Sequence, residues 1–373
     1  MSQKSTHITD LFGTLPTPSY IIDENVLRHN GEILASVAAH TGCKILLAQK
    51  AFSNYDFYPL LSGYLSGTEA SGLYEARLGA EEMPDKEVHV FCGAYRDDEF
   101  EELLTYADHI VFNSPHQFKK FAQKAKAAGK SIGLRINPEC STQDGHAIYD
   151  PCAPGSRLGT TRAVWNREMT GEWISLLDGL HFHTLCEQDS DDLETTLAAV
   201  ERSFGDILPQ MKWLNMGGGH HITRNDYDIA RLEKCITYAQ DQWNLCVYLE
   251  PGEAVALNAG YLITRVLDIV ENNGTHIAIL DTSAACHMPD VIEMPYMPPL
   301  YGAKAVTDKP ATNADSKHPD FVYRLAGPTC LAGDVIGDYT FAAPLHEGSL
   351  LVFQDMACLL YTSPSPRDTE RSR

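Results

Sequence analysis

Lys50 is a charged side chain whose position calls for a chemical explanation. It follows the apolar run 45–48 near the end of a predicted strand. A charged amine is costly there unless it is paired, modified or beside a cavity. Such an amine can bond covalently to the aldehyde of a cofactor. Alternatively its stem lies along apolar surface while the ammonium reaches water, and the segment alone does not decide between the two.

Two further motifs follow strand-like runs in the same way. Gly217, Gly218 and Gly219 end the apolar segment that begins at residue 213. Backbone N–H groups without side chains can approach a phosphate closely, although a tight turn would use glycines too. Glu250 follows the apolar run 247–249 and precedes Pro-Gly. Its carboxylate could hold a pyridine nitrogen protonated, or it could cap a helix or form an ion pair.

A histidine and a cysteine complete the candidate chemistry. His183 lies in a GLHFHTL segment, where alternation puts it on one strand face with His181. His183 could stack on a cofactor ring, whereas we interpret His181 as a hydrogen-bonded core residue. Cys330 lies in a turn-rich loop close to Asp334, so its thiol could donate a proton. On its own, Cys330 would be interpreted as an incidental loop cysteine.

The elements that must position these residues alternate between strand and helix. Eight strand candidates lie at 43–52, 67–72, 87–94, 109–114, 131–138, 179–184, 213–219 and 246–252. Helical patterns lie between them at 100–105, 115–128, 191–208 and 227–244. Eight such units are typical of a (β/α)8 barrel, although a doubly wound sheet alternates similarly. A barrel would bring Lys50, His183, the glycines and Glu250 to one rim, at the C-terminal ends of its strands.

The rest of the chain has the pattern of an all-β domain. Strands are expected at 254–272, 275–281, 333–341 and 349–354, and the strand-like segment 19–23 is expected to join them. We therefore expect an α/β barrel at 21–255, a β-domain at 256–357 and an N-terminal strand segment at 1–20. The Ser-, Pro- and Arg-rich segment 358–373 is expected to be a disordered tail.

Composition narrows the possible partners and compartment. The formal net charge of −21 disfavours nucleic acid and is compatible with a cationic ligand, although solubility alone would explain it. The ten cysteines lack metal-site spacing, so no metal is expected. No apolar run is long enough for a membrane span, and residues 1–7 do not resemble a signal peptide, so the cytoplasm is expected.

Taken together, the motifs resemble a known family over nearly the whole chain. They are LAQKAF at 47–52, NPE at 137–139, CAPGSRLG at 152–159, NMGGGHH at 215–221, EPGEA at 250–254 and DTSAACHMPD at 281–290. This set is similar to the fold-type III pyridoxal-phosphate (PLP) decarboxylases, the alanine-racemase-like barrel group. Within it the chain resembles the branch that decarboxylates carboxynorspermidine and carboxyspermidine to norspermidine and spermidine in polyamine biosynthesis.

The resemblance implies a role for each candidate residue. Lys50 would hold PLP covalently, and His183 would stack against its ring. Gly217, Gly218 and Gly219 would bind its phosphate, and Glu250 would pair with its pyridine nitrogen. Cys330 would reprotonate the substrate carbon from the other subunit of an obligate homodimer. Tyr361 would touch the phosphate.

Three departures from the family pattern are visible. Glu253 stands where ornithine and diaminopimelate decarboxylases have a phosphate-binding arginine, which favours the carboxynorspermidine branch. Leu331 follows the loop cysteine directly, whereas the family has an acid there. Tyr361 lies too far beyond residues 355–357, so we expect unrelated sequence to replace the native end of the β-domain.

The substrate also needs partners for its amines. Asp290, Glu293 and Asp334 are candidates for that role, and each could equally be an ordinary surface acid. A diaminopimelate-type decarboxylase and a non-catalytic regulator of polyamine metabolism remain as alternatives. Retention of both Lys50 and Cys330 argues against the regulator.

Overall fold

The computed structural model describes residues 11–143, 150–293, 296–307 and 321–357. The chain divides into two compact units. The first comprises Leu27–Ala256, and the second combines Met1–Val26 with Leu257–Arg373. Tyr361 and the predicted tail at 358–373 lie outside the described residues.

The first unit is a closed parallel barrel, as the alternating pattern predicts. Its strands are β2 (Lys44–Ala48), β3 (Gly67–Ala70), β4 (Glu87–Cys92), β5 (His109–Phe112), β6 (Ser131–Asn137), β8 (Gly179–His181), β9 (Trp213–Asn215) and β10 (Cys246–Leu249). Neighbours pair in the order β5-β4-β3-β2-β10-β9-β8-β6, and pairing of β5 with β6 closes the ring. A short strand, β7 (Thr160–Thr161), also pairs with β6. All eight predicted strands are confirmed, and most end two to four residues earlier than expected.

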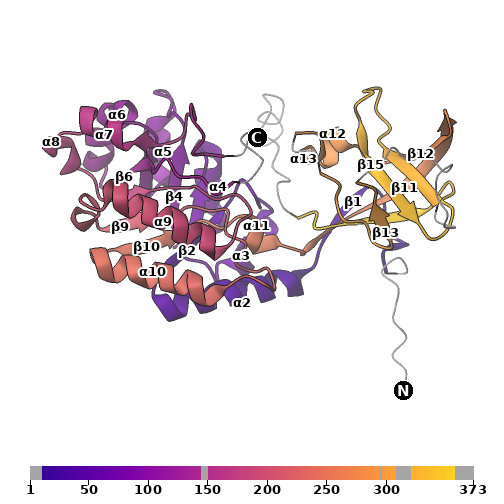
Figure 1. The fold of residues 1–373 in the computed structure, drawn as a ribbon, viewed down its shortest axis with the longest axis horizontal. Helices are drawn as coiled ribbons and strands as arrows, with labels where there is room; N and C mark the ends of the chain where they lie inside the picture. Colours follow the sequence, from indigo (N-terminus) through magenta and orange to yellow (C-terminus); the bar gives the residue numbers. More distant parts are fainter. Residues whose placement is uncertain (1–10, 144–149, 294–295, 308–320, 358–373) are drawn as a thin grey trace, which may run out of the picture. The chain divides into compact units, whose positions relative to one another are not determined.

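Helices lie around these strands (Figure 1). They are α2 (Glu24–Thr41), α3 (Tyr58–Leu61), α4 (Leu73–Glu82), α5 (Phe100–Tyr106), α6 (Pro115–Ala127), α7 (Arg162–Glu168), α8 (Gly171–Ile174), α9 (Ser190–Phe204), α10 (Ile229–Trp243) and α11 (Glu253–Ala256), with 3-10 turns at Tyr55–Phe57 and Leu208–Gln210. Helix α6 shows the sequence logic. The Ser114 side chain accepts a hydrogen bond from Gln117 N, Pro115 begins the helix, and an apolar face that includes Phe118 and Phe121 is buried.

Large aromatic side chains fill the barrel interior. Trp213 and Tyr248 pack with Leu46 and Val111 in one buried cluster. Room for the indole depends on a neighbouring glycine, because a Cβ on Gly179 would lie 2.0 Å from the Trp213 ring. The interior is therefore packed, and ligands have access to its ends rather than its centre.

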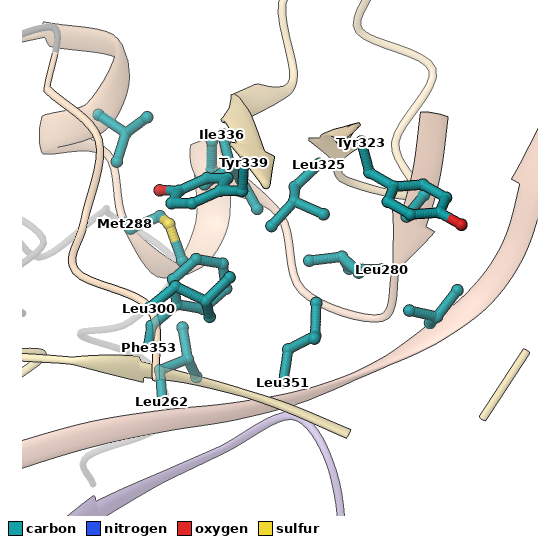
Figure 2. Packing of buried hydrophobic residues seen from close by; sticks show 14 of the residues in the cluster. Leu262, Leu280, Met288, Leu300, Tyr323, Leu325, Ile336, Tyr339, Leu351 and Phe353 are labelled. Atoms are coloured by element: carbon teal, nitrogen blue, oxygen red, sulfur yellow. The ribbon is translucent and has the colours of Figure 1, made fainter. Parts of the chain in front are cut away.

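The second unit is a curled, mainly antiparallel sheet. Its strands are β1 (Ser19–Ile22), β11 (Gly260–Asn272), β12 (Thr275–Leu280), β13 (Ala303–Ala305), β14 (Phe321–Ala326), β15 (Val335–Phe341) and β16 (Leu350–Gln354). They pair in the order β1-β11-β12-β14-β15-β13, and β16 pairs with β11. Figure 2 shows the core of this unit, where Leu262, Leu280, Tyr339 and Phe353 pack with their neighbours.

Several expectations for this unit are corrected. The predicted strand at 254–272 begins as helix α11, so β11 starts only at Gly260. Strands β13 and β14 and two short helices, α12 (Ala284–His287) and α13 (Asp290–Glu293), were not predicted. Strand β14 escapes prediction because it follows a proline-punctuated segment and pairs in parallel with β12, far from it in sequence. No helix among the described residues is long and apolar enough to cross a membrane.

Candidate active site

Four predicted groups lie just beyond the C-terminal ends of barrel strands. Lys50 follows β2 by two residues, His183 follows β8 by two, and Glu250 follows β10 directly. Two hydrogen bonds join these loops to the glycine run after β9. Gly218 N donates to His183 Nδ1 at 3.3 Å, and Glu250 N donates to Gly217 O at 2.8 Å. The structure therefore brings the glycines, His183 and Glu250 together on one rim.

The Glu250 side chain is a buried carboxylate with two donors. Only 4% of the residue is exposed. Asn215 Nδ2 donates to its Oε1 at 2.5 Å, and His181 Nε2 lies 3.1 Å from its Oε2. Burial opposes ionisation, but His181 and the hydrogen bond from Asn215 more than offset it, so the pKa of Glu250 lies below its ordinary value. A buried anion can therefore face a cationic ring nitrogen at this position.

His181 belongs to the site, which the sequence interpretation missed. It is buried and hydrogen-bonded as expected, but its partner is the Glu250 carboxylate itself. Its ring stacks on Phe91 with centroids 5.4 Å apart. Burial lowers the pKa of His181 against the attraction of Glu250. His181 thus helps to hold the Glu250 carboxylate in place.

Two other charged residues in the interior were also missed. Glu69 in β3 is buried, and burial together with the nearby Glu250 raises its pKa well above the ordinary value. Arg135 in β6 donates from Nη2 to His183 O at 3.0 Å and lies over the Phe91 ring. Burial lowers the pKa of Arg135 to about 10. The signal in the sequence was a charged residue within a predicted strand, Glu69 in 67–72 and Arg135 in 131–138.

The hydrogen bonds around His183 define its ring state. Arg135 holds its carbonyl oxygen, and Gly218 N donates to its Nδ1, so the ring proton lies on Nε2. Burial and the nearby Lys50 and Arg135 lower the pKa of His183 far below its ordinary value. A neutral, fixed imidazole is suited to lie against an aromatic ring.

The glycine run has the form of a phosphate-binding loop. Gly217 and Gly219 have φ values of 71° and 81°, and a Cβ on Gly219 would lie 2.1 Å from Leu185 O. The N–H of Gly217 donates to Asn215 Oδ1. Within the described part of the chain, the N–H groups of Gly219 and His220 donate to no protein acceptor. Two adjacent unpaired donors fit a phosphate group.

Lys50 is exposed at this rim and makes no hydrogen bond or ion pair with any described residue. Its charge acts on Glu69, Glu75 and His183. The amine is therefore accessible to a small molecule while acidic and aromatic side chains lie around it.

The remaining predicted residues belong to the sheet unit. Cys330 is exposed on the loop between β14 and β15. Asp334 is buried, and its carboxylate accepts hydrogen bonds from Ser283 Oγ at 3.0 Å, Ala284 N at 2.8 Å and Thr329 Oγ1 at 2.6 Å. Such a carboxylate shapes the Cys330 loop and is not available to a substrate. Asp290 is half-buried and Glu293 exposed on α13.

Among the described residues, three clusters could in principle hold a metal ion. They are Glu87 with His89 and His109, His181 with His183 and Glu250, and Glu187 with His221 and Glu253. In the first, the two histidine rings stack in parallel 3.9 Å apart, so their in-plane lone pairs do not converge. In the second, Glu250 already accepts from Asn215 and faces His181. The donor sets of these two clusters are poorly suited to an ion.

Comparison with known proteins agrees with this geometry. The family model described as "Pyridoxal-dependent decarboxylase, C-terminal sheet domain" matches residues 19–357. A carboxynorspermidine/carboxyspermidine decarboxylase from Campylobacter jejuni is 43% identical over 91% of this chain and 87% of its own length. A carboxyaminopropylagmatine decarboxylase from Synechocystis is 40% identical over 92% of this chain and 85% of its own length.

Solved structures show the same likeness. The crystal structure of carboxynorspermidine decarboxylase complexed with norspermidine from Campylobacter jejuni has a TM-score of 0.82 and 42% identity, covering 92% of this chain and 89% of that one. A Helicobacter pylori diaminopimelate decarboxylase has a TM-score of 0.71 and 18% identity, covering 94% of this chain and 88% of that one, so it shares the fold. The chain therefore belongs to the pyridoxal-dependent decarboxylases, and its cofactor is pyridoxal 5′-phosphate.

Proposed function

We propose that this chain removes the carboxylate of carboxynorspermidine or carboxyspermidine, releasing CO2 and the corresponding polyamine. The observation that carries the chemistry is Glu250, an ionised carboxylate buried at the same rim as Lys50 and the glycine loop. The substrate assignment is supported by the relatives at 43% and 35% identity, which are carboxynorspermidine/carboxyspermidine decarboxylases.

In this proposal the barrel residues bind and orient the cofactor. When bound, PLP supplies a ring that accepts the electrons left behind by departing CO2. Lys50 holds the cofactor through its amine between turnovers. Glu250 keeps a proton at the ring nitrogen, and Asn215 and His181 fix that carboxylate. Gly217, Gly218 and Gly219 would hold the phosphate, and His183 would contact the ring.

The sheet unit supplies the proton donor and the substrate contacts. Cys330 gives the thiol proton that replaces the departing carboxylate, and Asp334 orders its loop through Thr329. Asp290 and Glu293 bind the substrate amines. The net charge of −21 favours the approach of a polycation. We therefore assign cofactor binding to 21–255 and substrate contacts to 256–357; any role of Tyr361 stays a prediction.

We further propose a homodimer in which Cys330 of one subunit serves the barrel of the other. Mixing inactive Lys50→Ala and Cys330→Ala proteins tests this arrangement. Subunit exchange should restore roughly a quarter of the wild-type activity, because one site in four then carries both residues. Failure of a mixture that has demonstrably exchanged subunits would place both residues in one chain's site.

A substrate panel tests the activity itself. CO2 release should be fastest, by at least about tenfold in kcat/KM, from carboxynorspermidine or carboxyspermidine. The relative that acts on carboxyaminopropylagmatine favours including that compound as the second candidate. Activity on diaminopimelate alone would reject the polyamine assignment. A protein that binds PLP but turns over none of the four would be the regulator instead.

A further inference from the structure

We propose that His221, paired with Glu253, supplies the positive charge that binds the phosphate of the cofactor. The proposal rests on the proposed function, because the phosphate is that of PLP. It adds a binding residue that neither motif spacing nor the family pattern identified.

The glycine loop offers backbone N–H groups but no positive charge to balance a bound phosphate. A phosphate at the N–H groups of Gly219 and His220 carries more than one negative charge at neutral pH. Glu253 begins α11 after β10, and its carboxylate contacts His221, which follows the glycine loop. In a chain of net charge −21, a carboxylate beside a phosphate disfavours binding unless a cation lies with it.

His221 is the cation in the right place. The loop after β8 runs beside the glycine loop, because Gln188 N donates to Gly219 O at 2.9 Å and His221 N donates to Gln188 O at 3.2 Å. In the chain, His221 comes directly after Gly219 and His220, whose N–H groups have no acceptor among the described residues. Its side chain is only 12% exposed, and its Nε2 lies 3.1 Å from Glu253 Oε2.

The second ring nitrogen of His221 is the group left for a ligand. Its Nδ1 is buried and has no hydrogen-bond partner among the described residues. A buried polar atom without a partner is unfavourable in the isolated protein. A phosphate oxygen at the glycine loop would satisfy Nδ1 while Glu253 holds Nε2.

The surroundings of His221 favour its protonated form. Burial opposes protonation, but the hydrogen bond and charge of Glu253, with the charge of Glu187, outweigh it and raise the pKa of His221. His221 also contributes to the lowered pKa of the exposed Asp226. Arg224 opposes protonation, but its guanidinium is engaged by Asp189 and Asp226. Glu253 is thus a positioning residue that keeps His221 charged and oriented.

The experiment compares PLP with pyridoxal, which lacks the phosphate. Apoprotein is titrated with each compound, and dissociation constants are measured by absorbance. His221→Asn should weaken PLP binding by about 10- to 100-fold, the range of a charge-assisted hydrogen bond, and leave pyridoxal binding within about twofold. Glu253→Gln should also weaken PLP binding, but by a smaller factor than His221→Asn does.

A matched control uses another histidine–glutamate pair. His40 Nδ1 lies 2.8 Å from Glu233 Oε1 on the outside of the barrel. His40→Asn should leave both dissociation constants unchanged. Thermal melts of the apoproteins identify any variant that fails to fold, and Glu253→Gln then carries the comparison.

Three results would overturn the proposal. One is unchanged PLP affinity in His221→Asn, and another is an equal loss for PLP and pyridoxal. The third is one equivalent of bound metal in the wild type that His221→Asn loses while keeping PLP affinity, which would make the cluster an ion site. If the wild type itself binds no PLP, the proposed function fails instead.

Discussion

The two ends of the barrel contain the same residue types, but these residues have different roles at each end. The C-terminal rim holds Lys50, Glu250 and His181. The opposite mouth, at the strand N-termini, holds Lys44 and Glu87 at the starts of β2 and β4, with His89 just inside. From composition alone, either set resembles an active site.

At the mouth, the charged side chains pair with one another. Lys44 and Glu87 form an ion pair, and Glu87 Oε2 lies 3.0 Å from His89 Nε2. Lys44 Nζ also lies 3.3 Å from Tyr248 Oη. Burial opposes ionisation of Glu87, but bonds to His89 and Lys44 more than offset it and lower its pKa to about 2. Lys44, Glu87 and Nε2 of His89 therefore have their partners within this cluster.

At the rim, Glu250 and His181 are paired, but three other groups have no partner among the described residues. Lys50 has no ion pair there, and the N–H groups of Gly219 and His220 have no acceptor. The contrast shows that an accessible amine without an ion pair, beside adjacent free backbone donors, distinguishes the binding site from the structural cluster better than residue type does. Matched substitutions at the two ends test this interpretation.

The largest contrast is expected between the two lysines. Lys50→Ala should lower kcat by at least about 10³-fold, since it removes the amine that holds the cofactor in the proposed function. Lys44→Ala should keep kcat within about threefold and cost roughly 0–1 kcal/mol, because its ion pair is partly exposed. Steady-state kinetics and urea unfolding measure both. Equal losses of activity would erase the distinction between the ends.

The two glutamates give the next largest contrast. Glu250→Gln should lower kcat by about 10²-fold or more while PLP stays bound, because a neutral amide cannot hold the ring-nitrogen proton. Glu87→Gln should leave kcat unchanged and destabilise the fold by about 1–2 kcal/mol. Kinetics with cofactor content checked by absorbance separates the two. A fully active Glu250→Gln enzyme would remove the central role of that carboxylate.

A smaller effect is expected on the pH dependence of stability, and it comes from His109 at the mouth. Burial, with the neighbouring His89, lowers the pKa of His109 to about 3. Between about pH 6.5 and pH 3 the unfolded chain binds a proton that the folded chain does not, so stability falls as the pH drops, by up to about 1.4 kcal/mol per unit.

His109→Gln should flatten this dependence. The free energy of unfolding of the apoprotein, measured in urea between pH 6 and 4, should fall less steeply for the variant. Identical slopes would show that His109 is not held neutral by the fold. The same experiment on His40→Gln, an exposed histidine, serves as the control.

The barrel and the rim could be predicted from the sequence because both rest on local patterns. Apolar runs with helical segments between them mark all eight strands. The ends of the strands could not be read in the same way. The strand predicted at 43–52 includes the apolar residues Ala51 and Phe52, but β2 ends at Ala48.

The partners of the site residues depend on contacts between distant strands. His181 looked like a core residue because nothing local shows that β8 carries it to Glu250, on the loop 69 residues later. Asp334 was predicted to be a substrate-binding or surface acid because its donors, Ser283 and Ala284, lie about 50 residues earlier in the chain. Residue type and spacing identify candidates, and the fold decides which of them pair.

Lys50 is expected to hold the cofactor at the rim. Borohydride reduction of the PLP-loaded protein fixes the cofactor to its lysine, and mass spectrometry of the digested protein identifies that residue. A single pyridoxyl group is expected on the peptide that contains Lys50, and none on the peptide that contains Lys44. A pyridoxyl group on Lys44 or another lysine, with Lys50 unmodified, would contradict it.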